Sequence, residues 1–234
     1  MSVFRFKTFA VAQDGAAMKV GTDGVLLGAW APLDGNPQAI LDVGAGTGLL
    51  ALMLAQRSAA DTIDAVEIDA EAHATCVQNF EASPWADRLF CYHASLAEFA
   101  AEFGPEYDLV ISNPPFHAET VSSGKPARDQ ARQQHALPFP ELLESVAALL
   151  RPSGQFSLIL PYKEEGPFLS LAARYGFYPQ DVLRVCGRSG APPKRSLLHL
   201  LRHPVETRVR NLCIHDAGGA YSEAYRHLTR DFYL

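Results

Sequence analysis

The sequence predicts an α/β protein built on a largely parallel sheet with helices on both faces. The first observation is that short apolar runs with strand character recur along the chain, as at 39–43, 62–68 and 107–112. The second is that longer segments with helical periodicity separate these runs, as at 48–58 and 70–83. Because parallel strands need crossover connections, strands that alternate with helices favour a parallel sheet covered on both faces.

The remaining elements follow in a regular order. Residues 4–30 are expected to form an edge strand, a loop and a helix that is capped by Thr22 or Asp23. The later strands are expected at 89–93, 156–161, 178–187 and 195–203, and the later helices at 139–150 and 164–176. The tail after 220 has a helical pattern and is expected to dock on the core.

A single domain is expected for the 234 residues, of which 48% are hydrophobic. Within it, residues 1–38 are interpreted as a strand–helix extension and 39–234 as the core with its carboxyl-terminal tail. The first residues lack the apolar block of a signal peptide, and the longest aliphatic run is too short to cross a bilayer. The sequence therefore predicts a cytoplasmic protein without a membrane segment.

The cysteines carry no motif. They are Cys76, Cys91, Cys186 and Cys213. Since none of them forms a paired C-x-x-C spacing, reduced core cysteines are expected rather than disulfides or zinc ligands. No metal site is predicted.

Charge is distributed unevenly, although the formal net charge is only −6. From 61 to 108 there are eleven Asp or Glu residues and one Arg, whereas from 186 to 210 there are six Lys or Arg residues and one Glu. A polarised chain can bind a polyanion on one face while it remains acidic overall. The alternative is that these are ordinary solvated charges.

The segment ILDVGAGTGLL is the first chemical signal. Gly44, Gly46 and Gly48 follow a strand and open a helix, so the backbone can turn sharply and approach a ligand closely. The spacing is G-x-G-x-G and lacks the third glycine of a dinucleotide fingerprint. Glu67 ends the next strand, where a carboxylate can accept both ribose hydroxyls or can simply be a surface acid. Asp42 is expected to be half buried and to attract an ammonium group, so the pattern indicates an adenosine-bearing cofactor with a cationic end.

These residues resemble the cofactor site of class I S-adenosylmethionine-dependent methyltransferases. The resemblance implies a Rossmann-like fold with a seven-stranded, mostly parallel sheet and an antiparallel late strand. It also implies that the glycine loop passes beneath the methionine part, that Glu67 binds the ribose and that Ile68 packs on the adenine. Ser95 stands where the family usually has an Asp that contacts the adenine amino group. The implied cofactor residues are Thr22, Asp42, Gly44, Ala45, Gly46, Gly48, Glu67, Ile68, Ser95 and Asn113.

The segment DLVISNPPF ends an apolar strand at Asn113, Pro114, Pro115 and Phe116. By itself it can be a turn, because proline cannot donate to a sheet ladder. In the same superfamily, however, N-P-P-[YF] marks enzymes that methylate nitrogens conjugated to π systems. The Asn113 side-chain oxygen and the Pro114 carbonyl can each accept one N–H hydrogen bond and aim the nitrogen lone pair at the methyl group. Phe116 can stack on a flipped-out base.

The stretch AMKVGTDGVLLGAW and the tail YSEAYRHLTRDFYL resemble one family in particular. These are the bacterial tRNA methyltransferases that modify the exocyclic N6 amine of an adenine beside the anticodon of valine tRNA. The resemblance covers nearly the whole chain and implies tRNA as the partner, with no obligate protein partner. The cations expected to grip tRNA phosphates are Lys125, Arg128, Arg132, Lys194 and Arg195.

Two other functions stay open at this point. A protein-glutamine methyltransferase that acts on release factors shares the N-P-P-[YF] motif, but such enzymes usually carry a helical domain before the cofactor fold, and fewer than forty residues precede ILDVG here. A non-catalytic RNA-binding module on the same fold is the other possibility, which the intact glycine loop, Glu67 and Asn113 disfavour.

Overall fold

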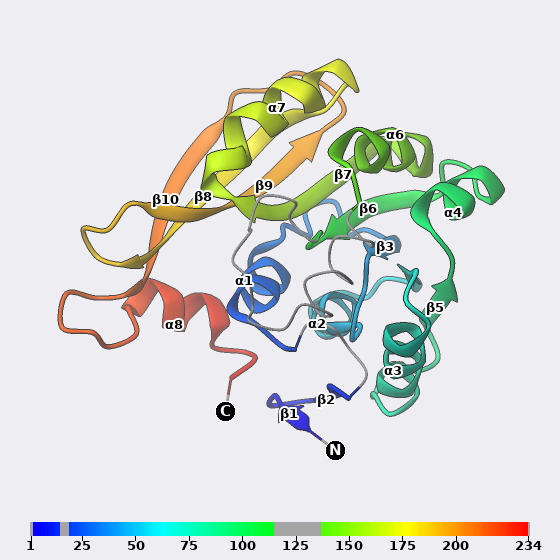
Figure 1. The fold of residues 1–234 in the computed structure, drawn as a ribbon, viewed down its shortest axis with the longest axis horizontal. Helices are drawn as coiled ribbons and strands as arrows, with labels where there is room; N and C mark the ends of the chain where they lie inside the picture. The colour runs from blue at the N-terminus through cyan, green and yellow to red at the C-terminus, as the bar shows by residue number, and fades with distance from the viewer. Residues whose placement is uncertain (1, 15–18, 115–136, 234) are drawn as a thin grey trace, which may run out of the picture.

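The computed structural model describes residues 2–14, 19–114 and 137–233, and it places a central sheet between two layers of helices (Figure 1). The first elements are β1 (Val3–Arg5), β2 (Ala10–Ala12), α1 (Thr22–Trp30), β3 (Ala39–Val43), α2 (Leu49–Arg57), β4 (Thr62–Glu67), α3 (Ala70–Glu81), β5 (Leu89–His93), α4 (Leu96–Glu102) and β6 (Tyr107–Ser112). The later elements are α6 (Phe139–Leu149), β7 (Leu150–Pro161), the 3-10 helix η1 (Tyr162–Glu164), α7 (Glu165–Arg174), β8 (Tyr178–Arg188), β9 (Pro193–Leu201), β10 (Arg208–His215) and α8 (Glu223–Thr229).

Within the described residues, the main sheet has eight strands in the order β10-β8-β9-β7-β6-β3-β4-β5. The strands β3 to β7 pair in parallel, and β9 alone runs antiparallel to both of its neighbours, β7 and β8. The predicted class and its antiparallel late strand are confirmed. The predicted count of seven strands is wrong by one, because β10 adds in parallel to β8 at the sheet edge. Residues 208–211 of β10 are all exposed, so the segment shows no alternation of buried and exposed side chains that would have marked it as a strand.

Helices cover both faces of this sheet and bury two separate sets of side chains. On one face, α1, α2, α3 and α8 contribute to one apolar cluster, together with β1 and β2. On the other face, α4, α6 and α7 contribute to the second cluster. Phe232 of the tail is buried in the first cluster, which confirms that the tail docks on the core.

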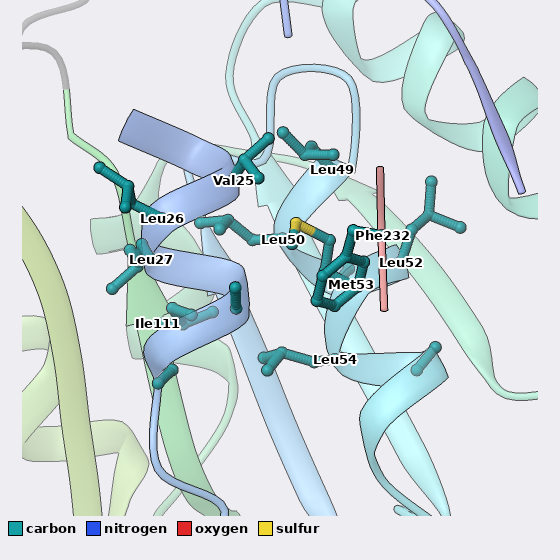
Figure 2. Packing of buried hydrophobic residues seen from close by; sticks show 14 of the residues in the cluster. Val25, Leu26, Leu27, Leu49, Leu50, Leu52, Met53, Leu54, Ile111 and Phe232 are labelled. Carbon is teal, nitrogen blue, oxygen red and sulfur yellow. The ribbon is translucent and has the colours of Figure 1, made fainter. Parts of the chain in front are cut away.

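Helix α1 packs closely on α2 through two glycines. A side chain at Gly28 would lie 2.5 Å from the Met53 sulfur, and one at Gly24 would lie 2.9 Å from the Leu49 side chain. The two glycines therefore let the backbone of α1 lie close to the side chains of α2. The apolar cluster between the two helices also includes Ile111 of β6 (Figure 2). This packing fixes the start of α1 next to the loop between β3 and α2. Gly21 occupies the N-cap position without a side-chain bond, so the predicted cap at Thr22 or Asp23 is wrong and the helix begins one residue earlier.

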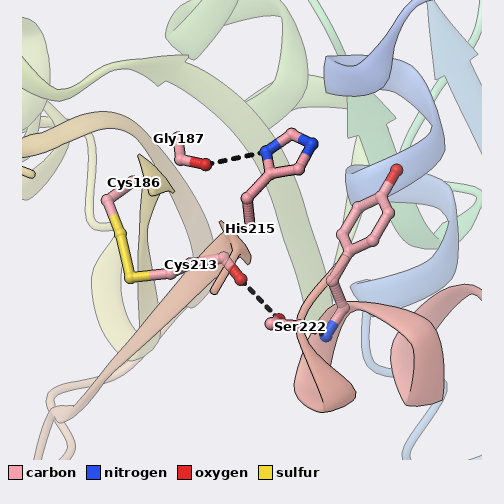
Figure 3. Close-up of a disulfide and its surroundings, with 6 residues drawn as sticks. Cys186, Gly187, Cys213, His215 and Ser222 are labelled. Atoms are coloured by element: carbon pink, nitrogen blue, oxygen red, sulfur yellow. Dashed lines mark hydrogen bonds between the residues drawn. A yellow bond between two sulfur atoms is a disulfide. The ribbon is translucent and has the colours of Figure 1, made fainter. Parts of the chain in front are cut away.

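Two of the four cysteines form a disulfide, which corrects the expectation that all are reduced. Cys186 of β8 and Cys213 of β10 are register partners in neighbouring strands, with 4.6 Å between their Cα atoms (Figure 3). Sequence spacing could not reveal this pair, because it depends on the register of a strand that was not predicted. Cys76 and Cys91 are free, as expected. Ser222, which caps α8, donates a hydrogen bond to the Cys213 carbonyl, so the disulfide lies beside the attachment point of the tail.

Candidate functional site

The carboxyl ends of β3 to β7 lie at one edge of the sheet, where open α/β sheets bind ligands. Because β9 is antiparallel, its amino end reaches the same edge, with Arg195 opposite Pro161 of β7. We call this the carboxyl edge. It collects the glycine loop, Glu67, Ser95 and Asn113, which were predicted from segments up to seventy residues apart.

The glycine loop turns at positions that only glycine tolerates well. Gly46 has a φ of +56° and Gly48 a φ of +76°, both in the left-handed region. A side chain at Gly48 would also lie 2.5 Å from the Phe80 ring, whereas one at Gly46 would meet nothing within 4 Å. The amide groups of Gly44 and Ala45 donate to the Val66 carbonyl, which ties the loop to β4.

Glu67 is buried at the end of β4 and holds the loop from the other side. One carboxylate oxygen accepts from the Gly46 amide at 2.7 Å, and the other accepts from the Asp69 amide at 2.9 Å. Each oxygen has a second lone pair, so the carboxylate can still accept hydrogen bonds from the two hydroxyls of a ribose. Ile68 follows directly and is 48% exposed, which leaves an apolar side chain open beside this carboxylate.

Asp42 is fully buried beneath the loop. Its Oδ2 accepts from the Ala51 amide at 3.1 Å, while its Oδ1 has no hydrogen-bond partner among the described residues. Burial raises the pKa of Asp42 to about 7, the Ala51 hydrogen bond partly opposes this shift, and the nearby Glu67 charge adds to it. A buried carboxylate with an unpartnered oxygen is a suitable neighbour for a cationic group, which would favour its ionised form.

Ser95 makes hydrogen bonds at the start of α4 that were not predicted from the sequence. It is the N-cap of α4, and its hydroxyl donates to Glu98 at 2.7 Å while it accepts from the Glu98 amide. The hydroxyl therefore keeps one lone pair with which to accept from an amino group. The predicted adenine contact stays a prediction, now with Glu98 fixed beside it.

Asn113 and Pro114 follow β6 next to the glycine loop. The Ser112 hydroxyl donates to the Val43 carbonyl at 2.9 Å, so the ends of β6 and β3 are tied together. Asn113 is half buried and Pro114 is buried. A side chain at Gly24 would lie 4.0 Å from the Asn113 amide nitrogen, so the first turn of α1 flanks the side of this residue. Pro115, Phe116, Lys125, Arg128 and Arg132 lie outside the described residues.

The predicted cations on β9 differ in their surroundings. Lys194 is exposed at the carboxyl edge, whereas the Arg195 Nε donates to Asp23 Oδ2 at 2.8 Å. This ion pair joins β9 to the first turn of α1, which also contains Thr22. Arg195 therefore helps to hold the first turn of α1 against β9. No cluster of His, Cys, Asp or Glu suited to a metal ion occurs in the part of the chain that the structure describes.

The chain is similar in sequence to known methyltransferases. A sequence model of the methyltransferase small domain matches residues 25–168. The chain belongs to this family. It is 52% identical over 233 residues to a Flavobacterium johnsoniae protein named tRNA1(Val) (adenine(37)-N6)-methyltransferase, with 99% of each chain covered. A Pectobacterium carotovorum protein of the same name is 46% identical, with 99% of this chain and 93% of the relative covered.

Solved methyltransferase structures share the fold. A predicted O-methyltransferase from Agrobacterium tumefaciens has a TM-score of 0.68 at 18% identity and is covered to 96%, against 90% of this chain. TYW2 of Pyrococcus horikoshii in complex with MeSAdo has a TM-score of 0.57 at 15% identity, with 86% of this chain and 71% of that chain covered. These likenesses confirm the predicted class I methyltransferase fold.

For a member of this family, the arrangement fits S-adenosylmethionine. The unpartnered Asp42 oxygen offers a negative charge to the cationic methionine end, and Glu67 and Ile68 offer a ribose acceptor and an apolar surface for adenine. The open side of Gly46 leaves room for close approach of the ligand to the loop. Among the described residues, no helix combines the length and apolar character that crossing a membrane requires.

Sequence reasoning missed a further group at the carboxyl edge, formed by Tyr162, Glu165, Arg184 and Ser196. Tyr162 is exposed directly after β7, and Arg184 and Ser196 reach Glu165 from β8 and β9. One signal was present in the sequence. In LILPY, as in LVISNPPF, a proline followed by an aromatic residue comes at or just after the end of an apolar strand.

Proposed function

We propose that this protein transfers the methyl group of S-adenosylmethionine to the exocyclic N6 of an adenine in tRNA, next to the anticodon of a valine tRNA. The relatives that carry this activity in their names match the chain from end to end at 40–52% identity. The observation that carries the proposal is the placement of Asn113 and Pro114 at the end of β6, tied through Ser112 to the strand that leads into the glycine loop.

The cofactor supplies a methyl group on a sulfonium centre, which is a strong electrophile. The chain must make the nitrogen nucleophilic, because the lone pair of an aromatic amine is delocalised into the ring. The Asn113 side-chain oxygen and the Pro114 carbonyl accept the two N–H hydrogen bonds of the amine, which favours a pyramidal nitrogen. Rigid proline backbone keeps the acceptor in place before the substrate arrives, so the contribution is preorganisation rather than proton removal.

The remaining predicted residues take supporting roles in this proposal. Thr22 opens α1 at the methionine end, and Ser95 accepts from the adenine amino group of the cofactor. Phe116 stacks on the flipped-out adenine of the substrate. The cations that contact tRNA phosphates are Lys125, Arg128, Arg132, Lys194 and Arg195. With tRNA as the substrate, the cytoplasm is the expected location.

The test is to incubate the protein with unmodified tRNA and labelled S-adenosylmethionine, and then to digest the tRNA and map the methylated nucleoside. N6-methyladenosine beside the valine anticodon is the expected product. Release factors in a parallel reaction serve as the competing substrate. Methylated glutamine in a release factor together with unmodified tRNA would overturn the proposal.

A further inference from the structure

Tyr162 stands next to the proposed reaction site on a neighbouring strand. Strands β6 and β7 pair in parallel with Ser112 opposite Leu158, so the residue level with Asn113 is Ile159. Tyr162 follows three residues later, roughly 10 Å further toward the carboxyl edge at the usual rise of a strand. Tyr162 therefore lies further out along the carboxyl edge than Asn113, on the side where a nucleotide next to the target adenine would lie.

A network of polar and charged side chains, anchored on the buried Glu165, lies against the Tyr162 ring. The Arg184 guanidinium lies over the ring, 5.5 Å from its centroid. Arg184 donates through Nε and Nη2 to both oxygens of Glu165, with the shortest bond at 2.7 Å. Glu165 is buried and also accepts from the Ser196 hydroxyl, which fixes the carboxylate from β9. One face of the ring is therefore backed by a cation that is itself held in place.

Tyr162 as a whole residue is nevertheless 37% exposed. An aromatic side chain that is both held and exposed offers a surface for stacking without further loss of side-chain freedom. Cations suited to an RNA backbone lie around it: Lys163 follows it in the chain, and Lys194 precedes Arg195, the register partner of Pro161. Alternating aromatic and basic side chains are how proteins hold single-stranded nucleic acid.

We infer that Tyr162, backed by Arg184, is the stacking platform for a base adjacent to the methylated adenine. The inference rests on the proposed function, because it places the flanking nucleotide of the same tRNA. Arg184 is a positioning residue here, since it acts through the Tyr162 ring. The alternative is a purely structural role, in which the ring only shields the Arg184–Glu165 ion pair from water.

The first experiment measures methylation kinetics on full-length unmodified valine tRNA for Tyr162→Ala and Tyr162→Phe. Loss of one stacked base raises KM for tRNA about tenfold or more. We expect this rise in Tyr162→Ala, with kcat at saturating tRNA and the cofactor Kd nearly unchanged, and wild-type behaviour in Tyr162→Phe. The matched control is Phe90→Ala, which removes an aromatic ring of 46% exposure on β5, four strands away in the sheet.

The second experiment separates stacking from a structural role. Valine tRNA is assembled with one abasic nucleotide on either side of the target adenine, and each RNA is assayed with wild type and Tyr162→Ala. At one of the two positions, loss of the base should raise KM in wild type by the same factor as Tyr162→Ala does, and it should add nothing in the variant. Arg184→Lys should show a smaller rise that also disappears on the abasic RNA.

Four outcomes count against the inference. If both abasic positions raise KM in Tyr162→Ala as much as in wild type, or if Tyr162→Ala leaves KM unchanged, the platform is overturned while the proposed function stands. Equal losses of tRNA and cofactor affinity in Tyr162→Ala would establish the structural role instead. If wild type methylates no adenine in intact tRNA, the proposed function fails, and the platform fails with it.

Discussion

The two halves of the carboxyl edge are held in different ways. On the cofactor half, at the ends of β3 and β4, the contacts run between a side chain and nearby backbone, as between Glu67 and the Gly46 amide. On the substrate half, at the ends of β7 and β9, the contacts join side chains to side chains of other elements. Arg195 reaches Asp23 across 172 residues, and Arg184 reaches Glu165 from another element. The cofactor half is therefore held by backbone amides that donate to Glu67, and the substrate half by ion pairs that form only when β8 and β9 have joined the sheet.

The charges of the two halves also differ. Buried acids lie under the cofactor half, with Asp42 and Glu67 close enough that the Glu67 charge helps to raise the Asp42 pKa. The substrate half presents cations, of which Lys194 is exposed. This division suits a cationic cofactor on one side and a polyanionic substrate on the other.

The largest effect of a change on the cofactor half is expected for Glu67→Ala. It removes the acceptor of the Gly46 and Asp69 amides as well as the predicted ribose acceptor. A hydrogen bond to a charged group contributes about 1.5–3 kcal/mol, so cofactor affinity should fall about ten- to a hundred-fold. Calorimetry with S-adenosylmethionine measures this, and the exposed Glu71→Ala on α3 is the matched control. An unchanged affinity of Glu67→Ala for S-adenosylmethionine would show that Glu67 does not bind the cofactor.

That half was also the more predictable one. The G-x-G-x-G spacing and Glu67 are recognisable because the chemistry depends on a short turn and on one acid at the end of the next strand. Ser95 shows the limit of prediction from the sequence. Its capping box with Glu98 depends on side-chain rotamers as well as on the sequence motif. The Arg195–Asp23 pair and the Cys186–Cys213 disulfide could not be derived, because each requires the register or packing of elements far apart in the chain. The same holds for Tyr162, whose backing by Arg184 exists only in the folded sheet.

The next prediction is that the affinity for the cofactor depends on pH, with a change of about tenfold. The pKa of Asp42 is raised to about 7 in the free protein, and a cationic ligand favours the ionised carboxylate. Cofactor affinity should therefore rise with pH, by about tenfold from pH 6 to pH 8, and binding near pH 7 should release protons. Calorimetry in buffers of different ionisation enthalpy measures both quantities. Asp42→Asn should bind more weakly and without this dependence, and a wild-type affinity that is flat from pH 6 to 8 would refute the assignment.

The smallest effect is expected on the substrate half. Lys194→Gln removes one exposed cation, so tRNA affinity should fall by a few-fold, and the slope of log K against log salt should become less steep by about 1. Cofactor affinity should stay unchanged. Arg174→Gln, at the far end of α7, removes another exposed cation as the control. Identical salt slopes for wild type and Lys194→Gln would show that Lys194 contacts no phosphate.

The central claim is that Asn113 activates an exocyclic adenine amine. The most direct measurement is the rate at which wild type and Asn113→Ala form N6-methyladenosine in valine tRNA, quantified by mass spectrometry of the digested product under saturating cofactor. Loss of one preorganised acceptor costs about a hundred- to a thousand-fold in rate. We predict a loss of this size in Asn113→Ala at saturating cofactor and tRNA, with an unchanged melting temperature. A wild-type rate of N6-methyladenosine formation in Asn113→Ala would contradict the account.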